Sequence, residues 1–246
     1  MDAVTRIGPE FYGSSNNNTT TKASFRSLER LYINGMCELK EWCNRVEGLE
    51  RLFPRLSSLS VFRCPKLRGP LCLPSPLRQL HVRITEESTA LLPPTGTYLC
   101  VIVCPSVSRL KEWIPWQNLA SIEHLEFWDE EMTTFPDDQL EEWVQHLTSL
   151  RSLHFEWCTK LQSLPSMHLH KLSLRHCCGI QSLSEEGLPS SLKKLVIDVC
   201  SDEFEDRCRK DGLDWPKISH IPTIIINSQE VQRLTEDSGD LINEGK

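Results

Sequence analysis

The stretch LRSLHFEWCTKLQSL at residues 150–164 is followed by LHKLSLRHCCGIQSL at residues 169–183. When each first leucine is offset 0, both stretches carry apolar residues at offsets 0, 3, 5, 11 and 14 and a cysteine at offset 8. A period of about 20–50 residues is typical of solenoids, in which repeated units stack on one another. These two segments therefore predict a repeat architecture rather than one globular core.

The same spacing continues along most of the chain. Nine copies start 19 to 29 residues apart, at Leu28, Leu56, Leu77, Leu99, Ile122, Leu150, Leu169, Leu192 and Ile221. In the copy that starts at Leu99, the pattern places Ile102 and Cys104 at offsets 3 and 5. A single repeat cannot bury its own apolar face, so the stability of each copy must come from its neighbours.

The spacing L-x-x-L-x-L-x-x-N/C-x-L is that of a leucine-rich repeat. Offsets 3 and 5 point to the same face of a short strand and into the core, whereas offsets 2, 4 and 6 point outward. A cysteine at offset 8 is expected to bond backbone groups inside the turn, which explains Cys64, Cys158, Cys177 and Cys200 without redox chemistry. We therefore predict an α/β leucine-rich repeat solenoid with a curved, parallel concave sheet and an irregular convex side with few short helices.

The predicted array covers residues 1–227, with about nine strands, and residues 228–246 are expected to form a polar tail. Residues 139–147 carry apolar side chains at i, i+3, i+4 and i+7, the pattern of an amphipathic helix. A second short helix is expected at residues 202–210. Other connections are rich in proline and serine and predict turns or extended coil.

The composition excludes several classes of protein. The chain has 34 leucines but only four alanines, which favours leucine as a packing residue over a mainly helical fold. A net charge of −7 argues against general nucleic-acid binding, and no stretch has the roughly 20 apolar residues of a membrane span. Eleven cysteines, an odd number, and a start without signal-peptide features predict a reducing location, cytoplasmic or nuclear.

Several segments closely resemble the C-terminal leucine-rich repeats of plant nucleotide-binding disease resistance proteins of the coiled-coil class. They are SFRSLERLYINGMCELKEW, LSSLSVFRCPKL, LRSLHFEWCTKLQSLP and the ending RCRKDGLDWPKISHIPTIIIN. The most specific motif is D-W-P-K-I-x-H-I-P at residues 214–222. The resemblance implies a role in effector sensing or autoinhibition, with a pathogen effector, a guarded host protein or the receptor's own nucleotide-binding domain as partner.

The chain also departs from that family. It contains no G-x-x-x-x-G-K-[ST] loop, so no nucleotide or other cofactor is expected. The opening residues place Met1, Val4 and Ile7 at offsets 8, 11 and 14, the second half of a repeat. Our hypothesis is that the chain is a C-terminal piece of a longer protein. Two alternatives remain: a regulatory segment or fragment with no ligand of its own, and a substrate adaptor for ubiquitin ligases, for which no adaptor-binding box is present.

Neither catalysis nor a metal site is expected. His154 and Glu156 match the H-x-E of zinc deaminases, but the P-C-x-x-C that accompanies it is absent, so both residues are read as alternate positions on a strand face. A second group of potential ligands, at residues 168–178, has no C-x2-C or H-x3-H spacing. Trp42 and Trp113, both at offset 14, are expected to fill the core.

The outward strand positions are the candidate binding residues, because folding does not require particular side chains there. The predicted protein-binding residues of the concave face are Tyr32, Phe62, Arg83, Glu126, Trp128, His154, Glu156, Trp157 and Arg175. Tryptophan, tyrosine and arginine most often carry interface energy, and Phe62, Trp128 and Trp157 are expected to be exposed. The alternative is that this face packs against a neighbouring domain or an overlying loop of the same protein.

Overall fold

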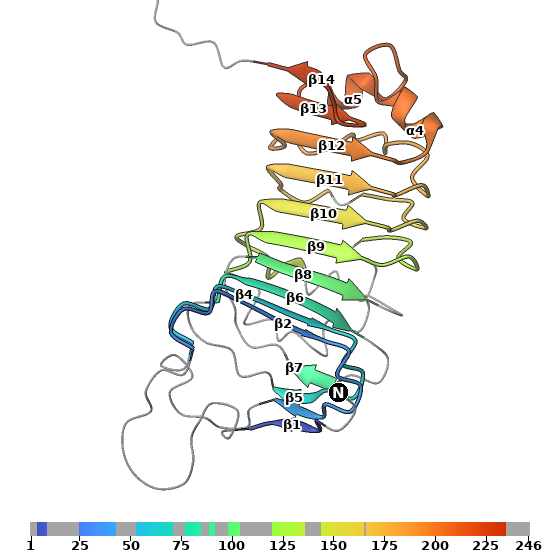
Figure 1. Ribbon diagram of the computed structural model, residues 1–246. Helices are drawn as coiled ribbons and strands as arrows, with labels where there is room; N and C mark the ends of the chain where they lie inside the picture. Colours follow the sequence, from blue (N-terminus) through green and yellow to red (C-terminus); the bar gives the residue numbers. More distant parts are fainter. Residues whose placement is uncertain are drawn as a thin grey trace, which may run out of the picture.

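A ladder of ten strands forms the main sheet (Figure 1). The computed structural model describes residues 4–8, 25–42, 53–70, 77–84, 89–91, 98–103, 120–135, 144–164 and 166–234. In spatial order the strands are β2 (Arg30–Asn34), β4 (Ser58–Phe62), β6 (Gln79–Ile84), β8 (Tyr98–Val103), β9 (His124–Trp128), β10 (Ser152–Glu156), β11 (Lys171–Arg175), β12 (Lys194–Asp198), β13 (Thr223–Ile226) and β14 (Gln229–Arg233). Every neighbouring pair from β2 to β13 is parallel.

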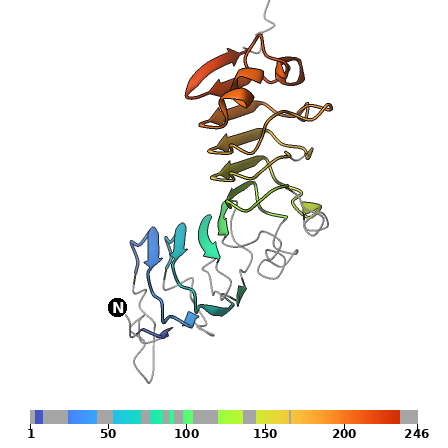
Figure 2. The same cartoon turned by 90° about the vertical axis from the view of Figure 1, so that its right-hand side faces the viewer.

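The sheet lines the inner side of a bend, and the connecting segments cover its outer side (Figure 2). This arrangement, with parallel strands on the concave side and few short helices, is the predicted leucine-rich repeat solenoid, and the prediction is confirmed. No helix among the described residues is long and apolar enough to cross a membrane.

The hydrophobic core is a stack of rows that run across the strands. Leu153 of β10 stands opposite Leu125 of β9 and Leu172 of β11, so residues at offset 3 follow one another from repeat to repeat. Phe127 and Phe155, both at offset 5, stack with ring centroids 5.9 Å apart, and both are fully buried. Offsets 3 and 5 are therefore inward positions in these repeats, as the alternation predicts.

The predicted register of the repeat around β8 is wrong. Leu99 pairs with Leu80 and Leu125, both at offset 3, so Leu99 is at offset 3 rather than 0. The expected inward residue Ile102 instead stands opposite Arg83 and Trp128, at offset 6. The run LCVIVC at residues 99–104 is apolar throughout, so alternation alone cannot fix its register, which is set by the neighbouring strands.

Short strand pairs form on the side of the coil opposite the main sheet. Strand β1 (Arg6–Ile7) pairs with β3 (Glu41–Trp42), and β5 (Arg68–Pro70) pairs with β7 (Thr89–Leu91). Ile7 stands opposite Trp42, so residues 6–7 occupy offsets 13 and 14, as expected for the second half of a repeat. Trp42 is buried, as predicted, whereas Trp113 lies outside the described residues.

The cysteines at offset 8 form a buried ladder. The single S–H of Cys177 is shared between the carbonyl oxygen of Arg175 in its own repeat, 3.3 Å from Sγ, and that of Phe155 in the preceding repeat, 3.5 Å from Sγ. Cys158 and Cys200 make the same two kinds of contact in their repeats. The predicted structural role of these thiols is confirmed.

The C-terminal end of the array is closed by helices and a hairpin. Helix α4 (Asp202–Arg207) confirms the helix expected after residue 201, and α5 (Trp215–Ile218) lies within the D-W-P-K-I motif. Residues 139–143 of the other predicted helix lie outside the described residues.

The sheet extends beyond the predicted boundary at residue 227. Strand β14, at residues 229–233, pairs antiparallel with β13, so these residues do not belong to a tail. Asn227 and Ser228 have φ angles of +49° and +63°, the left-handed pair that a two-residue hairpin turn needs. The side chain of Asn227 also donates to Glu205 of α4, which ties the hairpin to the helix.

Asp214, the first residue of the D-W-P-K-I motif, is a buried anion that joins three elements. Its carboxylate accepts hydrogen bonds from the Leu183 N–H at 3.1 Å and from Arg207 Nε at 2.9 Å, and Lys217 Nζ lies 3.0 Å away. Burial by itself raises the pKa of Asp214, but the hydrogen bonds from Arg207, Leu183 and Lys217 outweigh it, and the pKa is lowered. The motif therefore acts as a cap that holds the last helices on the repeat array.

We predict that Cys177 resists alkylation in the folded protein whereas its neighbour Cys178 reacts. Cys177 is fully buried, and its hydrogen-bonded contact with the Cys158 thiol, together with burial, raises its pKa to about 12. Cys178 is exposed. Iodoacetamide labelling followed by peptide mass spectrometry measures both sites in one sample, and equal native labelling of the two cysteines would contradict the buried ladder.

We predict that Asp214→Asn lowers the melting temperature at pH 7 by roughly 5 °C, because charge-assisted hydrogen bonds are lost. The pKa of Asp214 is depressed below its ordinary value of 3.8, so its contribution is present above that pH and is lost as the pH falls through the lower value. The difference between wild type and variant should therefore shrink below about pH 4. Asp206→Asn, at a mostly exposed side chain, is the control, and its melting temperature should equal that of the wild type. If the difference in melting temperature between wild type and Asp214→Asn does not depend on pH, the role of Asp214 as a charged cap is contradicted.

Candidate protein-binding surface

Five of the nine predicted binding residues lie on three neighbouring strands, and a sixth directly follows the middle strand. Glu126 stands opposite His154, and Glu156 stands between Trp128 and Arg175 in the register of β9, β10 and β11. Trp157 follows β10 directly. We call these six residues, Glu126, Trp128, His154, Glu156, Trp157 and Arg175, the central patch.

The other three residues lie further along the sheet. Tyr32 is on β2 and is 64% exposed, and Phe62 ends β4 and is half-buried. Arg83 lies on β6, opposite Ile102 of β8, and its side chain is outside the described ones. The structure therefore does not bring these three residues into the central patch, because β8 intervenes.

The expected exposure of the aromatic residues is only partly correct. Trp157 is 45% exposed, but Trp128 is half-buried, like Phe62. Neighbouring strands lie about 4.8 Å apart, so side chains in one row cover one another even on the outward face. Trp128 Nε1 also donates a 2.5 Å hydrogen bond to Glu126 Oε1, which holds the indole against the sheet.

A backbone feature sets the position of Trp157. Asp129, at offset 7 of the β9 repeat, has no positive φ, but the offset 7 residues of five other repeats before the C-terminal hairpin are left-handed, with φ angles between +51° and +71°. These residues are Gly35, Arg63, Trp157, His176 and Val199. The conformation turns the chain out of the strand before the buried residue at offset 8.

Hydrogen bonds hold this turn in place. The N–H groups of Trp157 and His176 each donate to the offset 6 carbonyl of the next strand, those of Arg175 and Asp198, at 3.0 Å. Residues other than glycine, asparagine and aspartate seldom adopt this conformation. The strain is greatest for a β-branched residue such as Val199. Offset 7 thus forms a row of side chains along one edge of the concave face.

Trp157 and His176 form a stacked aromatic pair in that row. Their rings stack with centroids 3.9 Å apart and an interplanar angle of 7°. Val199, which is 52% exposed, occupies the same offset in the next repeat. Sequence reasoning identified Trp157 but missed His176 and Val199, although their shared offset was a signal that could have found them.

The charged residues of the patch interact across the strands. His154 Nε2 lies 3.6 Å from Glu156 Oε2, and His154 Nδ1 lies 4.0 Å from Glu126 Oε2. Burial lowers the pKa of His154, although Glu126 acts in the opposite direction. Burial and the charge of Glu126 raise the pKa of Glu156. Arg175 Nε lies 3.7 Å from Asp198 Oδ2, near the exposed edge.

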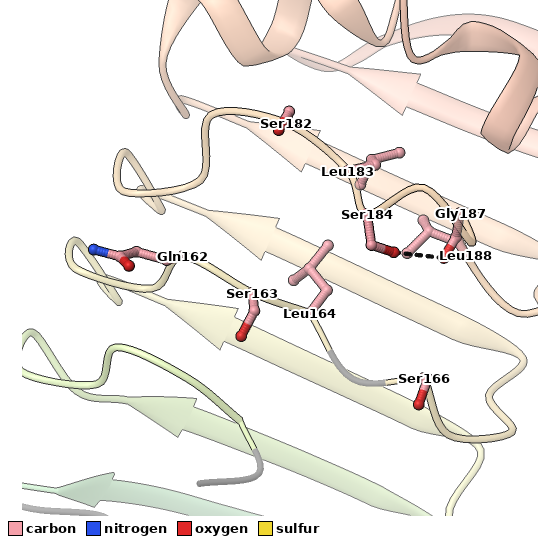
Figure 3. A pocket seen from close by; sticks show the side chains of 9 residues that line it. All are labelled: Gln162, Ser163, Leu164, Ser166, Ser182, Leu183, Ser184, Gly187 and Leu188. Carbon is pink, nitrogen blue, oxygen red and sulfur yellow. Dashed lines mark hydrogen bonds between the residues drawn. The ribbon is translucent and has the colours of Figure 1, made fainter.

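A separate cavity of about 250 Å³ lies between two loops on the convex side (Figure 3). Its lining is formed by Gln162, Ser163, Leu164, Ser166, Ser182, Leu183, Ser184, Gly187 and Leu188. None of these side chains is charged, and this lining offers no acid–base pair for catalysis.

Fold and repeat pattern together define the chain as a leucine-rich repeat protein. It is similar to "Putative disease resistance RPP13-like protein 1" of Arabidopsis thaliana, with 29% identity over 210 residues that cover 80% of this chain. The resemblance to plant disease resistance proteins is thereby confirmed, although the matched part spans only 18% of that relative's length.

No protein-family model matches the chain. Among solved structures, the leucine-rich repeat domain of the type III effector XopL is similar with a TM-score of 0.44 and 20% identity, over 83% of this chain and 70% of that one.

We predict that Val199→Asn stabilises the protein by about 1 kcal/mol, because asparagine tolerates the left-handed backbone that strains valine. Urea denaturation measures the free energy of unfolding. Val231→Asn in the extended strand β14 is the matched control and should be destabilising, since Val231 is partly buried against the core. A loss of stability in Val199→Asn would argue against strain at offset 7.

Proposed function

We propose that this chain is a protein-recognition module of the plant defence response, which acts by binding and without catalysis. The observation that carries this proposal is Trp157, a large aromatic side chain that is 45% exposed and stacked on His176. The leucine-rich repeat fold and the similarity to a disease resistance protein support it.

Trp157 has the physical properties of an interface residue. Contact between an apolar indole and water is unfavourable, and a partner that covers the indole removes this cost in free energy. Its stacking on His176 restricts its side-chain freedom, so little conformational entropy remains to be lost on binding. Exposed Arg175 accepts the Trp157 N–H at its carbonyl oxygen and lies 3.7 Å from half-buried Asp198, and these two side chains supply polar groups for the rim of an interface.

The proposed partner is a protein, either a pathogen effector or a host protein that the receptor guards, met in the cytoplasm or the nucleus. The offset 7 row offers an apolar contact through Trp157 and Val199. The recessed part of the central patch carries Glu126 and Glu156, which favour a partner with cationic groups.

A second candidate occupant is another domain of the same protein. The relative from Arabidopsis thaliana extends far beyond the matched part, so such a protein has further chain to place against this surface. In that case the central patch would keep a receptor inactive by an intramolecular contact and would not bind an effector.

We predict that Trp157→Ala abolishes partner binding while stability changes little. Wild type and variant are expressed with an affinity tag in leaves, with and without pathogen challenge, and co-purified proteins are quantified by mass spectrometry. Leu213→Ala is the matched control, because Leu213 is 75% exposed but lies at the C-terminal cap, away from the sheet. Melting temperatures of all three proteins are measured in parallel.

Loss of specific proteins in Trp157→Ala alone, at unchanged melting temperature, would support recognition. If the lost protein is the nucleotide-binding part of a resistance protein, the regulatory function replaces effector sensing. The same proteins recovered with wild type and Trp157→Ala, together with a clear loss of stability, would refute the recognition role of this tryptophan.

A further inference from the structure

Three potential metal ligands converge on the concave face. Glu126 of β9 and His154 and Glu156 of β10 each contribute one donor atom, and these atoms lie within 4.8 Å of one another. The residues come from repeats whose starts are 28 positions apart, and the parallel register alone places Glu126 opposite His154. Among the described residues, this is the one group of three or more His, Cys, Asp or Glu side chains that comes together in this way.

The three side chains are recessed rather than spread on the surface. Their exposed fractions are 13% for Glu126, 18% for Glu156 and 21% for His154. The Nε2 atom of His154 exposes less than 1 Å² and has no hydrogen-bond partner, although it points toward Glu156 Oε2 at 3.6 Å. Burying a ring nitrogen without a hydrogen-bond partner costs free energy, and coordination to a metal ion would give this nitrogen a partner.

The charges of these three side chains also favour the binding of a cation. The carboxylates of Glu126 and Glu156 both face the His154 ring in a recessed position, so two negative charges lie close together there. Arg175, the nearest cation in the register, has its guanidinium 3.7 Å from Asp198 and is half exposed. A divalent cation between the carboxylates would balance their charge.

The ligand geometry matches a first-row metal ion. With bonds to nitrogen and oxygen of about 2.0–2.2 Å, the ligand atoms of a tetrahedral site lie about 3.3–3.6 Å apart. The separation of 3.6 Å between His154 Nε2 and Glu156 Oε2 fits this spacing, whereas the 4.0 Å contact of Glu126 Oε2 is with the other ring nitrogen, Nδ1. The longest separation, at most 4.8 Å, closes by a small rotation of a glutamate carboxylate, a torsion with a broad minimum.

We propose that Glu126, His154 and Glu156 form a binding site for a divalent transition-metal cation such as Zn²⁺. One imidazole nitrogen and two carboxylate oxygens are ligands that suit Zn²⁺ and Mn²⁺. Trp128 is a positioning residue, because its indole N–H holds Glu126 Oε1 and leaves Oε2 facing His154. Three protein ligands leave an open coordination position.

Isothermal titration of the chelator-treated full chain with Zn²⁺ tests the site, with Co²⁺ absorption as a second readout. We expect one bound ion per chain, and a Co²⁺ spectrum without the charge-transfer band that thiolate ligands produce. Glu156→Gln and His154→Asn should each weaken binding more than tenfold, and Trp128→Phe by about tenfold, because the hydrogen bond that orients Glu126 is lost. His168→Asn, at an exposed histidine outside the group, is the control and should bind as wild type does.

Circular dichroism establishes that each variant is folded before titration. Absence of binding at millimolar Zn²⁺, a thiolate band in the Co²⁺ spectrum, or unchanged affinity in both His154→Asn and Glu156→Gln would overturn the site. Because the readout is metal binding by the chain alone, its failure would leave the proposed recognition of a protein by Trp157 standing.

Discussion

The fold depends on one constraint, the parallel register that aligns offsets 3 and 5 of each repeat with those of the next. Leu125, Leu153 and Leu172 follow one another in one buried row, and Phe127 and Phe155 stack in the other. A shift of one residue between two strands would turn both rows toward solvent, so the register is strongly specified. Every other feature of the concave face follows from it.

The register also explains why the candidate surface is where it is. After several of the strands the chain turns inward at offset 8, and offset 7 takes the left-handed conformation there even where its residue does not favour it. Gly35 meets this requirement without strain, but Trp157 and Val199 do not. Strained backbone that persists at a position with an exposed side chain is typical of functional sites. The turn that folding requires therefore places a row of exposed side chains along the edge of the concave face.

Much of the fold was predictable from the sequence, because the period-2 alternation and the offset 8 cysteines are local signals. Prediction failed where the local signal was absent. The run around Val101 is apolar throughout, so its register depends on β6 and β9, and the turn at Asn227 joins a strand whose residues are mostly polar. A buried anion such as Asp214 was equally hidden, since its partners Leu183 and Arg207 become neighbours only in the folded chain.

The sequence predicted where the candidate binding residues lie, but not which contacts their side chains make. The repeat places Trp157, Glu156 and Arg175 on the outward face, but it does not show that Trp157 stacks on His176. The meeting of Glu126 with His154 arises from a contact between strands 28 residues apart, which one-dimensional spacing does not encode, and the hydrogen bond from Trp128 to Glu126 is equally absent from the spacing.

The central claim is that the edge of the concave face around Trp157 contacts a protein partner. A photo-crosslinking amino acid placed at position 157, and at position 213 as the comparison site, tests this contact in intact leaf tissue. The account predicts a discrete crosslinked protein at position 157 that is absent at position 213. No crosslink at position 157, or the same products at both positions, would contradict it.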